Sequence, residues 1–106
     1  HFDYHDAGAV AALGEWLDET GVRLHAVHAP TAESDTGAVG GATLSLASAD
    51  ESRRQRAVAE TVASLQVATV IPCAYLVVHV GVPGADPGAN SRAAAARSLE
   101  EVAAAA

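Results

Sequence analysis

The chain has 106 residues, half of them apolar, which is enough for one hydrophobic core and too apolar for a disordered protein. Six basic residues, all arginine, stand against thirteen acidic ones, and the net charge of −7 disfavours broad binding to nucleic acid or anionic lipid. No apolar stretch approaches the roughly 20 residues of a membrane span, and no signal-peptide pattern is visible. We therefore expect a cytoplasmic protein that does not enter a membrane. The single cysteine, Cys73, is expected to be a buried structural thiol.

Residues 7–20 have the pattern of an amphipathic helix. Asp6 can cap its first turn, and Gly21 follows its last turn as a typical C-terminal residue. The apolar residues at helical spacing are Val10, Leu13 and Leu17. Trp16 widens this stripe, so we expect its ring to lie in the core.

A short strand is predicted over residues 22–28, where Leu24 and Ala26 share one face. It ends at Ala29-Pro30, because proline interrupts regular strand pairing. Residues 29–47 then read as a flexible surface loop rich in small residues. This loop contains neither a phosphate-binding loop nor a dinucleotide-binding fingerprint.

A second helix is predicted over residues 49–70, opened by the capping-box pattern Ser48-Ala49-Asp50-Glu51. Its expected buried stripe consists of Val58, Val62, Leu65 and Thr69. The charged residues that lie away from this stripe, and that we assign to a solvated face, are Arg53, Arg54, Arg56 and Glu60.

The clearest strand covers residues 75–80 and is nearly all apolar, as expected of a parallel strand covered on both faces. A turn-rich loop follows it. A third helix begins near Asn90 or Ser91. Its expected apolar stripe consists of Ala95, Leu99, Val102 and Ala106.

The predicted order of helix, strand, helix, strand, helix indicates an α/β fold in which parallel strands are joined by right-handed crossovers. We expect residues 22–28 and 75–80 to be adjacent in one sheet. Two strands do not make a stable sheet by themselves. Residues 1–106 are therefore expected to be part of a larger domain, which agrees with a chain that starts without Met and stops within a helical pattern.

Both predicted strands end with a histidine that precedes a turn, in Val27-His28-Ala29 and Val78-His79-Val80. In parallel α/β sheets, ligands bind at the carboxyl ends of the strands. His28 and His79 are therefore candidates for binding a divalent metal or a substrate. Alternation along the strand places His25 on the opposite face, where it is expected to be structural. A weaker metal-site candidate is His5, in a cluster with His1, Asp3 and Asp6.

The His28-Ala29-Pro30 strand end, the segment 44–51 (LSLASADE) with the helix after it, and the strand ending at His79-Val80-Gly81 resemble the xylose-isomerase-like barrel superfamily. That superfamily includes sugar phosphate isomerases/epimerases and apurinic/apyrimidinic endonucleases. The resemblance implies a (β/α)8 TIM barrel, of which this chain would supply the third and fourth strands. It also implies that His28 and His79 lie near a divalent metal or the substrate.

The resemblance further implies that the complete protein is a metal-dependent sugar or sugar-phosphate isomerase or epimerase acting on a small sugar or polyol. The catalytic carboxylates would come from later strands, so the chain alone is expected to be inactive. One alternative is a metal-dependent endonuclease-type phosphodiesterase for abasic DNA. The stretch 31–43 departs from the endonuclease pattern, and this disfavours a nucleic-acid partner. The other alternative is a non-enzymatic α/β binding module in which both histidines are structural. The substrate, the metal and the oligomeric state stay open.

Overall fold

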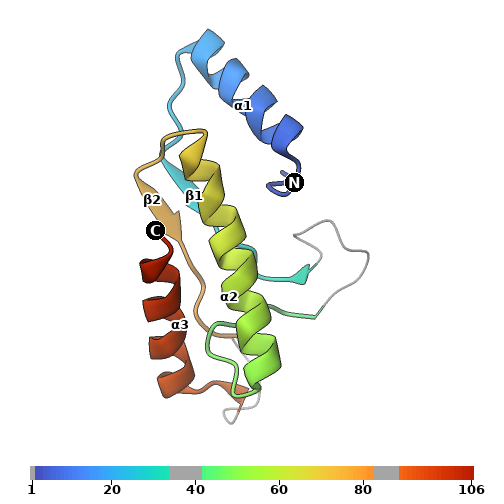
Figure 1. Cartoon of the computed structure of the whole chain (residues 1–106), viewed down its shortest axis with the longest axis vertical. Helices are drawn as coiled ribbons and strands as arrows, with labels where there is room; N and C mark the ends of the chain where they lie inside the picture. The colour runs from blue at the N-terminus through green and yellow to red at the C-terminus, as the bar shows by residue number, and fades with distance from the viewer. Residues whose placement is uncertain (1, 34–41, 83–88) are drawn as a thin grey trace.

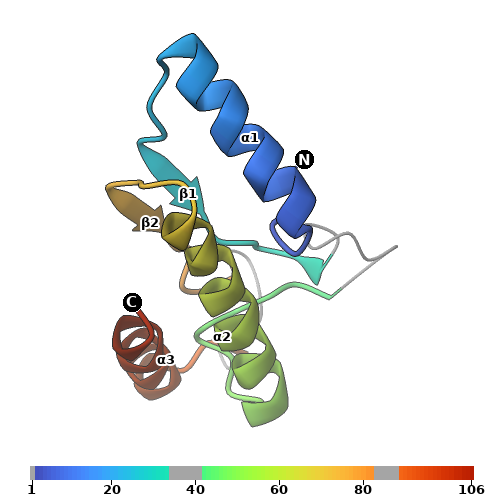
Figure 2. The same ribbon diagram turned by 45° about the horizontal axis from the view of Figure 1, so that its top comes forward.

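The computed structural model describes residues 2–33, 42–82 and 89–106. The elements follow the predicted order (Figure 1). They are α1 (Ala7–Thr20), β1 (Ala26–His28), α2 (Glu51–Leu65), the 3-10 helix η2 (Gln66–Thr69), β2 (Tyr75–Val77) and α3 (Arg92–Ala104). In both ribbon views α1 lies apart from α3, the two strands lie between them, and α2 runs alongside α3 (Figure 1, Figure 2).

The strand pair confirms the predicted parallel arrangement. β1 and β2 are neighbours in one sheet, with Ala26 opposite Tyr75 and His28 opposite Val77. Both strands are shorter than predicted and have three residues each. Their direction brings both carboxyl ends to the same edge of the sheet, which is where the candidate histidines lie.

The first helix has the bounds that its end signals predict. The Asp6 carboxylate accepts hydrogen bonds from the backbone N–H groups of Gly8 and Ala9, and Gly21 ends the helix with a left-handed φ of 68°. Trp16 was expected in the core, and this prediction is wrong because its ring is 55% exposed. The reason is angular: Val10 and Leu17 define the buried face, and Trp16 lies about 100° around the helix from Leu17.

The second helix begins and ends differently from the prediction. The cap is Asp50, whose side chain accepts from the Arg53 N–H, and the α-helix ends at Leu65 before one 3-10 segment. The predicted stripe is confirmed at Val58 and in part at Val62, which is half-buried and packs against the core. It is wrong at Thr69, which is exposed. The buried residues of α2 are Arg54, Ala57, Val58, Thr61 and Ser64.

The third helix is rotated relative to the prediction. Ser91 caps it, as expected, by accepting from the Ala94 N–H. Its buried residues are Ala94, Ser98 and Val102, whereas Leu99 is 41% exposed. Ser98 faces α2, where its hydroxyl accepts a hydrogen bond from Arg54.

The apolar core has two parts. One part joins α2 and α3 to the segment before α2, and it consists of Leu44, Leu46, Ala57, Val58 and Val102. The other joins α1 to η2 and the residues just after it, and it consists of Val10, Leu17, Val67 and Ile71.

The prediction of a flexible surface loop is wrong for its last part, which lies within the buried segment of residues 44–48. All five are buried, and Leu46 is only 2% exposed. The Ala47 N–H donates to the Val80 carbonyl, and the Ala47 carbonyl accepts from the Ser91 N–H. These bonds satisfy the backbone polar groups of the segment, so it can enter the core without regular secondary structure. The part of the predicted loop over residues 34–41 lies outside the described residues.

The prediction that Arg54 lies on a solvated face is wrong. Its side chain is 2% exposed and binds Glu51 through two hydrogen bonds, of 2.9 Å from Nε and 2.6 Å from Nη2. Its Nη1 donates to Ser98 Oγ at 3.1 Å and lies 2.9 Å from the Glu101 carboxylate. The Ser98 hydroxyl in turn donates to the Leu46 carbonyl at 2.7 Å. One guanidinium therefore ties α2 to α3 and to the buried segment before α2.

This network predicts a loss of stability in acid. Hydrogen bonds from Arg54 lower the pKa of Glu51 from 4.5 to about 2, so the contribution of its carboxylate is present above pH 4.5 and is lost as the pH falls toward 2. We expect the Glu51→Gln variant to be less stable at pH 7 and to lose less stability than the wild type between pH 4.5 and 2. Urea unfolding at several pH values measures this, with Glu100→Gln on the exposed face of α3 as control. An unchanged pH slope in Glu51→Gln would contradict it.

Candidate functional site

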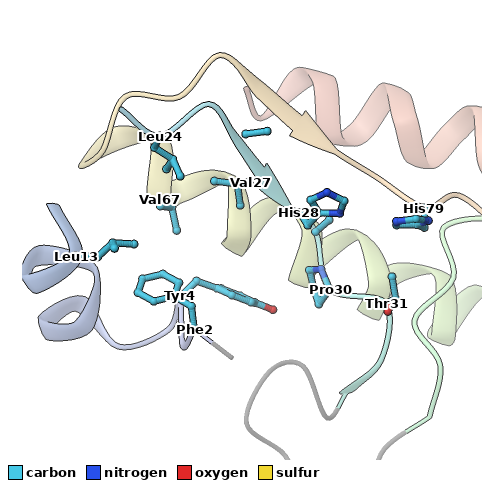
Figure 3. Close-up of a pocket in the computed structure, with 12 residues that line it drawn as sticks. Phe2, Tyr4, Leu13, Leu24, Val27, His28, Pro30, Thr31, Val67 and His79 are labelled. Carbon is cyan, nitrogen blue, oxygen red and sulfur yellow. The ribbon is translucent and has the colours of Figure 1, made fainter. Parts of the chain in front are cut away.

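The two strand-end histidines lie next to each other. His28 is the last residue of β1, and His79 lies two positions beyond the end of β2. Their ring centroids are 5.9 Å apart, with an angle of 32° between the ring planes (Figure 3). The predicted parallel pairing accounts for this meeting, because both chains leave the sheet at the same edge.

A cavity of about 510 Å³ opens beside this pair. Most of its wall is apolar and comes from Phe2, Tyr4, Leu13, Leu24, Val27 and Val67. Its polar groups gather at one end, where His28, His79 and Thr31 lie (Figure 3). A second cavity, of about 470 Å³, shares His79 and Thr31 with the first and is bounded by Thr43 and Gly81. His79 therefore stands between two hollows at the strand ends.

Both imidazoles have nitrogens free to bind a ligand, so far as residues 2–33, 42–82 and 89–106 are concerned. Both side chains are exposed, and no hydrogen bond joins either ring to a described residue. Two imidazoles on one metal ion, with bonds of about 2.0–2.1 Å, have centroids on the order of 5 Å apart. The observed separation of 5.9 Å is close to this value, so the two residues are compatible with one shared metal ion. No group of three or more His, Cys, Asp or Glu suited to a metal occurs among the described residues.

His25 lies apart from this pair, just before the first residue of β1. Its ring meets the edge of the Tyr75 ring with centroids 5.2 Å apart, and it lines a different cavity near the start of the strands. The His25 carbonyl accepts from the N–H groups of Ala74 and Tyr75. Cys73 lines the same cavity and is half-buried, so it is less enclosed than expected.

His5 does not join the strand-end histidines either. Its Nε2 lies 2.8 Å from Glu60 Oε2, which also accepts a 2.8 Å hydrogen bond from the Tyr4 hydroxyl. Asp6 is occupied as the cap of α1, and Asp3 accepts from the His5 backbone. The predicted acidic and histidine cluster thus anchors the chain before α1 to α2, and His1 lies outside the described residues. Glu60, expected on a solvated face, is the residue that receives these contacts.

Sequence reasoning missed two polar residues near the histidines. Thr31 lines both hollows next to His79. Asn90, expected only as a possible start of α3, hydrogen-bonds the chain that follows His79. The position of Thr31, three residues after His28, is a signal that could have found the first. The contact of Asn90 spans eight residues and leaves no pattern in the sequence.

Parallel strands that alternate with helices and place polar side chains near their carboxyl ends occur in α/β barrels and in doubly wound α/β folds. The family model for the xylose isomerase-like TIM barrel matches residues 1–106, and the chain belongs to this family. No curated protein and no solved structure matches the chain. The described residues provide two parallel strands, whereas a TIM barrel closes with eight.

Within the described part of the chain, no helix is long and apolar enough to cross a membrane.

Proposed function

We propose that this chain supplies the metal- or substrate-facing ends of two strands in a divalent-metal-dependent sugar or sugar-phosphate isomerase or epimerase. The observation that carries the proposal is the 5.9 Å approach of the His28 and His79 rings at the carboxyl edge of the sheet. Membership of the xylose isomerase-like TIM barrel family supports it, because barrel enzymes place their chemistry at this edge.

The proposed chemistry divides between the two histidines and groups on other strands. A divalent metal bound to adjacent substrate oxygens would stabilise the negative charge that develops during proton transfer at carbon. His28 and His79 would hold such an ion through their neutral ring nitrogens, or orient the substrate hydroxyls by hydrogen bonds. The acid and base that move the proton would be carboxylates from later strands of the barrel, so the chain alone would be inactive.

The charge of the chain favours a small neutral or singly phosphorylated substrate over a polyanion. With thirteen acidic and six basic residues, the chain offers little general attraction to nucleic acid, which is the substrate of the endonuclease-type alternative. A phosphodiesterase of that type would need several metal ions. Metal stoichiometry in the complete protein therefore separates the two reactions.

The test is Zn²⁺ binding by the chain and by three histidine variants. The wild type is expected to bind one Zn²⁺ weakly, because two protein ligands seldom make a tight site. His28→Ala and His79→Ala should each weaken binding about tenfold or more, since either change halves the pair. Isothermal titration calorimetry measures the affinity.

His25→Ala is the matched control, because His25 directly precedes β1, which ends at His28, but lines another cavity. It should keep the Zn²⁺ affinity of the wild type and change mainly the unfolding midpoint. If all three variants bind Zn²⁺ as the wild type does, the two histidines are structural. The binding-module alternative would then replace the enzyme.

A further inference from the structure

The backbone that carries His79 is not held by the strand ladder. Regular pairing of β2 with β1 ends at Val77, two residues before His79. A side chain on an unpaired stretch can hold a fixed distance to His28 only if other contacts fix the chain on both sides of it. The 5.9 Å separation of the rings therefore depends on the contacts that the chain makes beyond the end of β2.

The first such contact lies at Val80. Its carbonyl accepts a 2.8 Å hydrogen bond from the Ala47 N–H and a longer one, of 3.5 Å, from Ser45 Oγ. Ala47 belongs to the buried segment 44–48, so this end of the chain rests on the core. The side chains of Val78 and Val80 also pack against the core cluster that contains Leu46. These contacts reach only as far as Val80, so the chain at Gly81 and Val82 needs a further contact.

The second contact is made by the Asn90 carboxamide at Val82. Its Nδ2 donates to the Val82 carbonyl at 3.2 Å, and its Oδ1 accepts from the Val82 N–H at 3.3 Å. The side chain thus pairs with both backbone groups of one residue, as a neighbouring strand would. Gly81 permits this approach, because a Cβ there would lie 3.1 Å from Asn90 Oδ1.

Asn90 is itself fixed to the core. It forms an antiparallel bridge with Ser48, and the Ser91 N–H next to it donates to the Ala47 carbonyl at 2.7 Å. On the other side the Ala49 N–H donates to the Ala89 carbonyl. The same buried segment therefore holds Val80 directly and Val82 through Asn90.

We infer that Asn90 is a positioning residue, which fixes the backbone after His79 and thereby sets the separation of the His79 and His28 rings. It acts through the backbone of Val82 and touches neither imidazole. The geometric role stands on the hydrogen bonds of Val80, Val82 and Asn90, and its catalytic meaning rests on the proposed function. Asparagine suits this position because its carboxamide offers one donor and one acceptor to the two backbone groups of Val82.

The test compares Asn90→Ala, which removes both hydrogen bonds, with Asn90→Asp, which keeps the acceptor and loses the donor. Gln55→Ala is the control, because the Gln55 carboxamide also makes two side-chain bonds, to Glu51 and Glu101, on the outside of α2 and α3. With the full chain labelled in histidine, NMR records the nuclear Overhauser cross-peak between the His28 and His79 rings. Thermal unfolding of each variant gives its stability.

The expected result is a cross-peak in the wild type and in Gln55→Ala, a weaker one in Asn90→Asp, and a loss of at least about half its intensity in Asn90→Ala. An unchanged cross-peak in Asn90→Ala would overturn the inference, and so would its absence in the wild type. An equal loss of cross-peak intensity in Gln55→Ala would also overturn the inference, because the loss would then reflect a general loss of stability. If Asn90→Ala fails to fold, the cross-peak of Asn90→Asp is the test: a weaker cross-peak supports the inference and an unchanged one overturns it.

Zn²⁺ titration of the same samples separates this inference from the proposed function. Asn90→Ala is expected to weaken Zn²⁺ binding about tenfold, the usual effect of losing a residue that orients a ligand. If the wild type binds no Zn²⁺ but the cross-peak responds to Asn90, the positioning role stands and the proposed function fails. If the wild type binds Zn²⁺ through both histidines and Asn90→Ala binds it equally well, the positioning role fails alone.

Discussion

Replacing Arg54 by alanine is expected to lower the melting temperature by several degrees Celsius, while Arg53→Ala leaves it within about one degree. The two residues are neighbours in the sequence and carry the same charge. Arg54 is buried and joins Glu51, Glu101 and Ser98, whereas Arg53 is exposed and has no side-chain partner among the described residues. The expected difference in melting temperature therefore measures the contacts of Arg54 and not the loss of one positive charge.

The size of the effect comes from the gap that alanine leaves. Two helices lose the cation that connects them, and a void opens where a side chain with 2% exposure had packed. Hydrogen bonds to Glu51 and Glu101 also raise the pKa of Arg54 above its usual range, so the lost group is a cation at every pH of interest. Arg54→Lys should recover only part of the loss, because an ammonium cannot reproduce the planar fork.

Thermal unfolding followed by circular dichroism measures these differences. Equal melting temperatures for Arg53→Ala and Arg54→Ala would show that the ion pairs across α2 and α3 contribute no net stability. The physical basis for such a result would be that the carboxylates of Glu51 and Glu101 remain partly solvated, and exposed ion pairs contribute little.

The order of elements, the parallel pairing and the meeting of His28 and His79 could be predicted from the sequence. Each depends on local signals: Asp6 and Gly21 mark the ends of α1, and the apolar run before His79 marks a strand. The prediction that this strand is covered on both faces is wrong, because Tyr75 is 61% exposed. Once two strands alternate with helices, the right geometry at the strand ends follows from topology. The proximity of the two rings is a consequence of that topology.

Which face of each helix is buried could not be predicted so well, and the reason lies in small polar side chains. The buried faces of α2 and α3 include Thr61, Ser64 and Ser98, whose hydroxyls donate to backbone carbonyls. A stripe of large apolar residues therefore gives the wrong rotation in α3, where Leu99 is exposed. The burial of Arg54 could not be predicted either, because two of its partners, Ser98 and Glu101, lie more than forty positions away in the sequence.

The buried segment 44–48 is the other feature that periodicity could not show. The segment forms no helix or strand beyond the single bridge from Ser48 to Asn90, and the backbone of Ala47 bonds Val80 and Ser91, far along the chain. Leucine at 44 and 46 was visible in the sequence, but small and polar neighbours made the stretch look like a loop. Its burial matters for the site, because this segment supports the chain after His79.

Leu46→Ala is therefore expected to destabilise the fold by about 3 kcal/mol, and Leu99→Ala by less than about 1 kcal/mol. The substitution removes the same atoms in both variants, but Leu46 is 2% exposed within a core cluster and Leu99 is 41% exposed on α3. Periodicity in the sequence predicts the reverse order, with Leu99 in the core and Leu46 in a surface loop. Urea unfolding at pH 7 measures both free energies. A cost for Leu99→Ala that equals or exceeds the cost for Leu46→Ala would contradict the observed rotation of α3 and the burial of segment 44–48 together.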